Sequence, residues 1–543
     1  MTNRAFKSGE SREQPSLFPA RIEDYVGLEN PVRAIDSFVN ALDLAKLGFQ
    51  HADRRLLGVG QPPFDPADLL KLYLYGYSNQ VRSSRRLERE AYRNLELIWL
   101  LKNLKPGYRT IASFRAKNAE ALKAVNRRFV LLLRELGLVG GTLVAVDGAL
   151  FHGNAAKDSI FTQGKLTKQI AKLDEEIEAY VTSLDTNDAA EAKLPFDGSG
   201  NGSEGGGSGD VGGKMKELMA RRERALADLK ELENGDKGQV STTDPDARLM
   251  SKGDQTIAGY NVQSVVDDKH KLIIESEVIN RSDAGHLHQM AKAAKETLAA
   301  ETLQVLADAG YSSSEDLKAC EDDGITAYVP LNESNHKLKK QGRFTRKDFS
   351  YDAATNAYRC PADQLLHQTK KPWTNVSGRV EHRYLGSKAT CGDCPLKASC
   401  LSSKARYRAI NRWEHEAVLE RHRQRMASEG AAELMRRRSA IVEHPFGTLK
   451  CRAGYRHFLV RGFKKVRGEW SLMALCYNFT RVLNILGFDR FTAYLAEKLR
   501  VAHNRCLVTL ADALRAIPLV SRRFRVNIAL SLAITPFRAI LTS

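Results

Sequence analysis

Long apolar runs are absent from this sequence. No uninterrupted apolar stretch reaches the roughly 20 residues that a helix needs to cross a bilayer. The first residues, Met-Thr-Asn-Arg, lack the pattern of a secretory signal peptide. Cysteine is scarce, with 8 residues among 543, so a dense disulfide framework is excluded. These absences predict a cytoplasmic protein without a membrane partner.

Acidic residues are in the minority. Lys and Arg number 83 against 65 Asp and Glu, which leaves a formal net charge of +18 at pH 7. An excess of this size indicates a polyanionic partner, with nucleic acid ahead of an anionic membrane surface. The length of 543 residues is enough for two or three domains with a sizeable core.

The N-terminal quarter has a helical pattern. Residues 1–22 are polar and predict a loose leader, and apolar spacing predicts a helical domain over residues 23–140. Asp65 is placed to cap the helix expected over residues 66–77. Arginines concentrate on two neighbouring helices of this domain, at Arg82, Arg85, Arg86, Arg89 and Arg93. That concentration suits a DNA-binding unit, and equally a helical bundle with a charged exterior.

An α/β core is expected next. Alternation and turn composition predict strands at residues 142–146, 259–267, 271–279, 303–307 and 326–329, with helices at residues 283–300 and 315–323. Three meandering strands followed by helix, strand, helix and strand match the order of an RNase H-like fold. We therefore predict an RNase H-like catalytic core made of residues 141–162, 240–335 and 413–498.

Three further segments interrupt or follow that core. Residues 163–239 predict a helical hairpin whose arms are separated by the flexible Gly/Ser-rich linker 197–210. Residues 336–412 contain a cysteine-rich insert, and residues 499–543 are a basic tail. The RNase H-like order holds only if the hairpin is an insert between the first and second strands.

Three carboxylates have matching contexts in this arrangement. Asp147 ends the first predicted strand, Asp308 ends the fourth, and Glu443 lies on a later helix. Lys450 follows Glu443 by seven residues, two helical turns, so both side chains face the same way. Pro445 is expected to kink or restart this helix, because proline removes a backbone donor. The plainer interpretation is that strand-end Asp residues cap turns and that the helix face carries solvated ion pairs.

Four cysteines gather in the cysteine-rich insert, at Cys360, Cys391, Cys394 and Cys400. Cys391 and Cys394 form a CxxC pair, and thiolates at this spacing can share one tetrahedral zinc ion. Four ligands complete a structural site, with His382 as an alternative ligand. Reduced cysteines without a metal are the other interpretation.

The stretch from Arg436 to Lys450 resembles the C-terminal signature of bacterial insertion-sequence transposases of the DDE type. The resemblance continues over residues 454–462, Glu469, Trp470, Tyr477 and Asn478. More narrowly, the chain is similar to the "eleven eighty-two" group, in which many relatives carry Tyr-x2-Arg-x3-Glu-x6-Lys. Glu443 and Lys450 fit this pattern, whereas Arg438 stands one residue earlier than the Arg of the family.

Other parts of the chain carry the same resemblance. The first-acid motif of these transposases resembles the residues Asp147, Gly148, His152 and Asn154. Their second-acid motif resembles residues 307–311, which contain Asp308. Residues 79–90 and 110–115 look like their N-terminal domain.

The resemblance implies a cut-and-paste DDE transposase. Asp147, Asp308 and Glu443 would then bind Mg²⁺, for which Mn²⁺ can substitute, because such cations prefer oxygen ligands. Two metal ions would activate water to nick the transposon end, and then a 3′-hydroxyl for strand transfer. Lys450 and Arg438 would hold phosphate near the metals.

The resemblance also implies the partners. They are double-stranded DNA, as transposon ends and as target, and a second copy in a homodimeric synaptic complex. The DNA-binding residues of the N-terminal domain would be Arg82, Arg85, Arg86 and Arg89. The expected location is the nucleoid of a bacterium. The alternatives are a catalytically silent DNA-binding protein derived from a transposase, and an RNase H-like nuclease that does not transpose.

Overall fold

The computed structural model describes residues 21–52, 62–191, 211–234, 238–253, 255–332, 338, 340–374 and 378–501. The Gly/Ser-rich linker lies outside these residues, as do residues 1–20 of the leader and 502–543 of the tail. The chain divides into two compact units, one of residues 1–129 with 448–543 and one of residues 130–447. None of the described helices is long and apolar enough to cross a membrane.

The first unit consists of helices. They include η1 (Ile22–Tyr25), α1 (Pro31–Asn40), α2 (Pro66–Ser78), α3 (Ser84–Arg93), α4 (Leu95–Leu100), α5 (Tyr108–Lys117), the start of α6 (Ala119–Glu135), and α16 (Phe463–Leu486). Asp65 accepts a hydrogen bond of 2.8 Å from the backbone N–H of Ala67, which confirms the predicted cap of α2. Helix α2 is buried from Leu69 to Tyr77 because α1, α4, α5 and α16 surround it. Lys71 on this buried stretch is paired with Asp36 at 2.7 Å.

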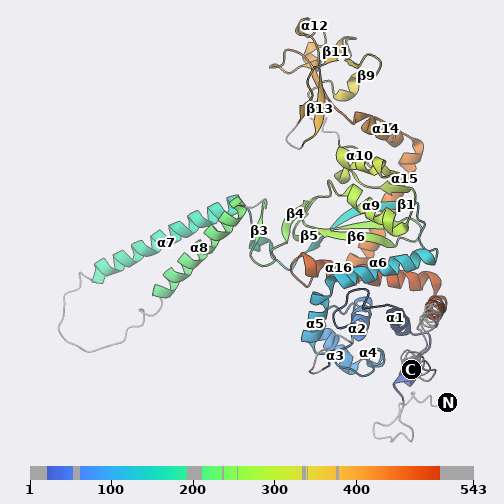
Figure 1. Ribbon diagram of the computed structural model, residues 1–543. Coiled ribbons are helices and arrows are strands. Elements are labelled where there is room, and N and C mark those ends of the chain that lie inside the picture. The colour runs from blue at the N-terminus through green and yellow to red at the C-terminus, as the bar shows by residue number, and fades with distance from the viewer. Residues whose placement is uncertain are drawn as a thin grey trace, which may run out of the picture. The chain divides into compact units, whose positions relative to one another are not determined.

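The second unit is built on a six-stranded mixed sheet (Figure 1). Its strands are β1 (Leu143–His152), β4 (Arg248–Lys252), β5 (Gln255–Asp267), β6 (Ile273–Ile279), β7 (Leu303–Leu306) and β8 (Ile325–Tyr328). The order across the sheet is β6, β5, β1, β7 and β8, and β4 pairs with the beginning of β5. Strand β5 is antiparallel to β1, β4 and β6, whereas β1, β7 and β8 are parallel. The five predicted strands form, and β4 was not predicted.

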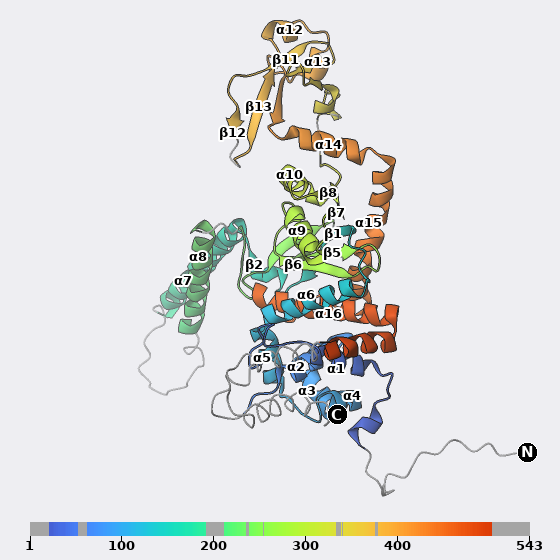
Figure 2. The same cartoon turned by 45° about the vertical axis from the view of Figure 1, so that its right-hand side comes forward.

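Helices cover this sheet (Figure 2). They include α9 (Leu287–Leu298), α10 (Ser314–Asp322), α14 (Glu416–Met426) and α15 (Glu429–Gly447). Helix α9 packs against β5 and β6, and α15 packs against β1, β5 and β7. Pro445, where a kink or a restart was expected, lies inside α15, so the helix does not restart there and passes directly into the π-helical turn η6 (Thr448–Arg452). A wider turn can absorb the hydrogen-bond mismatch that a proline introduces.

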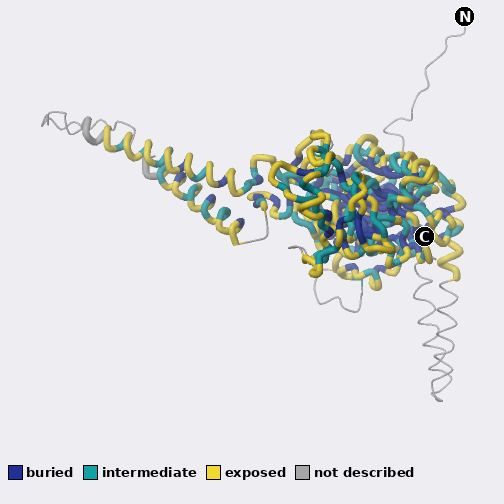
Figure 3. Tube along the Cα trace, turned by 90° about the horizontal axis from the view of Figure 1, so that it is seen from above, coloured by how far each residue is buried: buried dark blue, intermediate teal, exposed yellow. Residues whose placement is uncertain are grey.

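The predicted helical hairpin consists of α7 (Gln163–Glu191) and α8 (Val211–Asn234), which lie side by side. At its base, β2 (Ile160–Phe161) and β3 (Val240–Ser241) pair antiparallel. Near the base Leu166 packs with Ala225 and Leu232 in a small core. Exposed and half-buried residues dominate both arms (Figure 3).

The cysteine-rich segment contains a second sheet, which the sequence did not predict. Its strands are β9 (Ser350–Asp352), β10 (Ala357–Arg359), β11 (Leu365–Gln368), β12 (Trp373–Thr374), β13 (Val380–Leu385) and β14 (Ala409–Trp413). They pair antiparallel in the order β12, β13, β11, β10, β9, with β14 beside β13. Tyr358, Tyr384 and Ile410 form its core with Phe349. Two short helices, α12 (Lys388–Gly392) and α13 (Lys397–Cys400), carry cysteines.

Candidate active site

Asp147 and Asp308 lie at the same level of two neighbouring parallel strands. Ala145 on β1 pairs with Leu306 on β7, and each Asp stands two residues beyond this pair. Because successive strand residues alternate between faces, both carboxylates belong to the face of Ala145 and Leu306. Asp308 has an extended backbone and accepts a 2.8 Å hydrogen bond from the N–H of Gly310.

One detail of the predicted first strand was wrong. Asp147 does not end β1, which continues to His152. The strand continues because β5 pairs with it from Val144 to His152, whereas β7 pairs only with Leu143 to Ala145. Asp147 therefore lies where β1 loses its parallel neighbour and keeps its antiparallel one.

Helix α15 is attached to the same face. Its Ile441 and Val442 are buried against Ala145 and Leu306. Arg438 lies one turn before Val442, and its Nη1 is 3.8 Å from Oδ2 of Asp147. Glu443 directly follows Val442, is exposed, and makes no hydrogen bond or ion pair with the described residues. Its carboxylate is free to accept a ligand.

The Asp147 carboxylate is largely buried, with its side chain 17% exposed. Burial is the main cause of a raised pKa of Asp147, and the charge of Asp308 adds to it. Lys252 and Arg438 act in the opposite direction and lower this pKa. The Nζ of Lys252 is 3.4 Å from Oδ1 of Asp147 and donates to the carbonyl of Gly148 at 2.7 Å. The sequence did not single out Lys252, because strand β4 was not predicted. In the sequence, β4 is marked only by a short strand-like run.

The charges of three carboxylates act on the hydroxyl of Tyr311. Burial is the largest cause of its raised pKa, followed by the charges of Asp283, Asp147 and Asp308. Tyr311 donates a hydrogen bond to Oε1 of Gln263. Asp283 was expected to begin a helix, but α9 begins four residues later and Asp283 belongs to the preceding loop. The folded chain thus adds an acid that the sequence did not single out.

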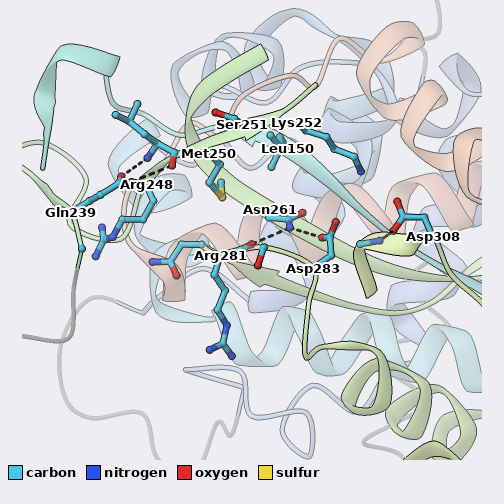
Figure 4. A pocket seen from close by; sticks show the side chains of 15 residues that line it. Leu150, Gln239, Arg248, Met250, Ser251, Lys252, Asn261, Arg281, Asp283 and Asp308 are labelled. Atoms are coloured by element: carbon cyan, nitrogen blue, oxygen red, sulfur yellow. Dashed lines mark hydrogen bonds between the residues drawn. The ribbon is translucent and has the colours of Figure 1, made fainter. Parts of the chain in front are cut away.

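A cavity of about 730 Å³ opens beside these acids (Figure 4). Its lining combines basic with acidic side chains, among them Arg248, Lys252, Arg281, Asp283 and Asp308. Cationic groups next to carboxylates can receive a phosphate together with a divalent cation. The cavity therefore suits phosphodiester chemistry.

The three predicted acids are not assembled as a metal site. Among the described residues, no three His, Cys, Asp or Glu side chains stand close enough to hold a metal ion. Carboxylates repel one another, and at Asp147 the side chains of Lys252 and Arg438 supply the neutralising charge. The donors of Asp147, Asp308 and Glu443 are nevertheless the oxygens that Mg²⁺ prefers.

Apart from Arg438, the predicted phosphate-binding and DNA-binding residues fall into three groups. Lys450 lies in η6, which belongs to the first unit. Arg85, Arg86 and Arg89 are exposed on α3. Arg82 was expected beside them, yet it is 9% exposed.

Burial removes Arg82 from the set of candidate DNA contacts. Its Nη1 donates to the carbonyl of His457 at 2.8 Å and lies 3.7 Å from the buried carboxylate of Glu469. Arg85 instead extends over the ring of Tyr108, with 5.2 Å between its guanidinium carbon and the ring centroid. Arg82 holds the helical unit together, and Arg85 remains at the surface.

The four clustered cysteines, which are free thiols, line one cavity of about 30 Å³, but among the described residues no three of them stand close enough to hold a metal ion. Burial raises the pKa of the Cys400 thiol, Arg408 lowers it, and the other three thiols raise it. His382 does not line this cavity, and its Nδ1 is 2.7 Å from Nε2 of Gln368.

Two regions of the chain match transposase family models. Residues 359–483 match a model described as "Transposase DDE domain", and residues 20–117 match one described as "Transposase domain (DUF772)". These matches are characteristic of bacterial insertion-sequence transposases. The resemblance found in the sequence is thereby confirmed. The DDE match includes Glu443, whereas Asp147 and Asp308 precede it.

No curated protein matches the chain. Among solved structures, the piggyBac transposase in its synaptic complex with hairpin DNA is similar, with 9% sequence identity and a TM-score of 0.29. The similarity covers 92% of this chain and 85% of that chain. At this TM-score it carries no structural argument.

Proposed function

We propose that this transposase is a DDE enzyme that binds the terminal inverted repeats of an insertion sequence and catalyses their Mg²⁺-dependent cleavage and strand transfer. One observation carries the proposal. Asp147 and Asp308 stand two residues beyond a parallel pair, Ala145 and Leu306, on which α15 packs. That helix bears Glu443, the third acid.

We extend the proposal to the fold of the second unit. The sheet order β6, β5, β1, β7, β8, with three antiparallel strands followed by two parallel ones, supports an RNase H-like catalytic core. The helical hairpin follows β1 and the cysteine-rich segment follows β8, so both are proposed as inserts into this core.

In this proposal Asp147, Asp308 and Glu443 bind Mg²⁺, or Mn²⁺ in its place. When bound, paired divalent cations activate the attacking oxygen and stabilise the leaving oxygen of an in-line displacement. Lys252 and Arg438 flank Asp147 and can turn their charges toward a phosphate. In cleavage, a bond from water oxygen to phosphorus forms while the bond to the 3′ oxygen breaks. In strand transfer, the freed 3′-hydroxyl attacks a target phosphodiester in the same manner.

The exposed arginines of α3 are proposed to bind the transposon ends. Arg85, Arg86 and Arg89 lie within the region that matches the second family model. Phosphate neutralisation by such side chains supplies most of the affinity of non-specific DNA binding. A homodimer is proposed for the synaptic complex, because two ends must be processed together.

Substitution of the three acids tests the catalytic proposal. D147N, D308N and E443Q preserve side-chain size and remove the anionic ligand. Each variant should still shift DNA that carries the element's ends, while nicking and strand transfer in Mg²⁺ both collapse. D158N, which changes an exposed acid, should remain active.

The outcomes separate the competing functions. A D308N protein that nicks transposon ends near the wild-type rate would show that the site is misassigned. Wild-type nicking without any strand transfer on paired ends would favour a nuclease that does not transpose.

We also propose a structural zinc ion held by Cys360, Cys391, Cys394 and Cys400. Their shared cavity of about 30 Å³ supports this, because it has room for one small ion. The double substitution C391S/C394S should release zinc, as measured by elemental analysis, and should lower the melting temperature. C451S, at an exposed cysteine outside the insert, should keep it. Wild-type protein prepared without chelators and found free of zinc would refute the site.

A further inference from the structure

We propose that Asp283 is a further carboxylate ligand of the divalent-cation centre, beside Asp308. This inference rests on the proposed function, because it assumes that Asp147 and Asp308 bind the cation. Asp283 lies in the loop that leads into α9, and no sequence pattern marked it as a site residue. Asp283 lies beside Asp308, is held by two hydrogen bonds, and has a buried neighbour, Asn261, whose Oδ1 lacks a hydrogen-bond donor among the described residues.

Two glycines show where the Asp283 carboxylate lies, and one of them places it beside Asp308. A Cβ atom on Gly310 would stand 2.9 Å from Oδ1 of Asp308 and 3.5 Å from Oδ2 of Asp283. These two oxygens therefore border the same small space. A Cβ atom on Gly148, which follows Asp147 and faces the opposite side of β1, would collide with Oδ1 of Asp283. Only glycine at position 148 leaves room for this carboxylate.

The Asp283 carboxylate is oriented like that of a metal ligand. Its Oδ1 accepts hydrogen bonds of 2.7 Å from Nδ2 of Asn261 and from Nε2 of Gln263. Gln263 is fully buried and is itself bonded to Tyr311. One carboxylate oxygen is thus held, and the other lies 3.5 Å from where a Cβ atom on Gly310 would stand. Ligating carboxylates are commonly positioned by such hydrogen bonds.

Asn261 supplies an independent indication of a cation. It is 4% exposed and lines the cavity together with Asp283 and Asp308 (Figure 4). Its Oδ1 has no hydrogen-bond donor among the described residues. The amide cannot be turned over, because Nδ2 already donates to the carbonyl of Arg281 at 3.1 Å and to Asp283. A buried oxygen of this kind is costly unless a donor or a cation satisfies it.

Asp283 could instead serve only to hold its loop, and D283N separates the two roles. An Asn side chain keeps an oxygen that can accept from Asn261 and Gln263, but it lacks the anionic charge. We expect the full-length D283N protein, without DNA, to bind Mn²⁺ about tenfold more weakly than wild type in calorimetric titration. Its melting temperature in metal-free buffer should not change. D267N is the matched control, because Asp267 is a buried acid that accepts from backbone N–H groups at the other end of β5.

The titration distinguishes two failures. If D283N binds Mn²⁺ like wild type while D308N loses affinity, the role of Asp283 is refuted and the proposed function stands. If D147N and D308N also bind Mn²⁺ like wild type, the proposed centre itself is refuted. A D283N protein that melts lower without metal would indicate a merely structural acid.

A measurement on the wild-type chain covers the case in which D283N does not fold. Fe²⁺ bound in place of Mg²⁺ generates radicals that cut the nearby backbone in the presence of ascorbate and peroxide. We expect cuts around residues 147, 283 and 308, suppressed by excess Mg²⁺. Cuts at the other two positions without one near residue 283 would overturn the proposal.

Discussion

The ammonium nitrogen of Lys252 lies 3.4 Å from Oδ1 of Asp147. Lys252 ends β4, more than a hundred residues after Asp147 in the chain, and Arg438 on α15 approaches the other carboxylate oxygen at 3.8 Å. A largely buried carboxylate is thus neutralised by two cations from distant elements. The same carboxylate is the first proposed metal ligand, so metal ions and these side chains compete for it.

The first prediction follows from this competition. K252M should bind Mn²⁺ more tightly than wild type, by roughly thirtyfold, because a unit positive charge about 4 Å from a divalent cation repels it by about 2 kcal/mol even in water. Calorimetric titration of the DNA-free protein measures the affinity. K318M, at a lysine of α10 paired with Asp322, is the control. Unchanged or weaker Mn²⁺ binding by K252M would mean that the Lys252 ammonium does not compete with the ion for the Asp147 carboxylate.

The second prediction concerns pH. Burial raises the folded-state pKa of Asp147 above its ordinary value of 3.8, so the folded chain holds this proton more strongly than the unfolded chain. Ionisation of Asp147 therefore lowers the free energy of unfolding. This loss of stability is absent below pH 3.8 and complete above the folded-state pKa. D147N should melt slightly higher than wild type at pH 7.5 without metal, and the difference should shrink as the pH falls toward 4. A pH-independent difference in thermal scans would contradict this origin.

The third prediction addresses the buried charges of the first unit. Glu469 is fully buried, accepts hydrogen bonds from Tyr77 and from the N–H of Leu459, and lies within 3.7 Å of Arg82 and Arg115. E469Q leaves two buried guanidinium groups without a counter-charge, so it should lower the stability of this unit by about 3–5 kcal/mol.

Urea denaturation of the full chain measures this loss. E90Q, which breaks the surface pair of Glu90 with Arg93, should leave the unfolding midpoint almost unchanged. Equal midpoints for E469Q and wild type would show that the buried pairs are not needed for stability.

The fourth prediction tests the DNA-binding surface. The triple variant R85A/R86A/R89A should bind transposon-end DNA more weakly, and its log affinity should fall less steeply with log salt concentration, by about 0.9 for each lost phosphate contact. Mobility-shift titrations at several salt concentrations give the slope. K216A/R221A/R224A removes the same charge from exposed positions of α8 and should keep the wild-type slope. An identical loss in both variants would point to net charge rather than to α3.

Local patterns in the sequence were enough for much of the architecture. Alternation marked the five strands that place Asp147 and Asp308, and helical spacing marked α2 and the two arms of the hairpin. The motif around Glu443 identified the transposase family, which the family matches confirmed. These features could be predicted because hydrophobic periodicity and short motifs act over a few residues.

Only the tertiary structure decided what surrounds the acids. It brought Lys252 and Asp283 to them from an unpredicted strand and from a loop. It also buried Arg82 against Glu469 and packed α16 on α2 and α5. Such contacts join residues tens to hundreds of positions apart. They depend on how elements pack, and no local periodicity records that packing.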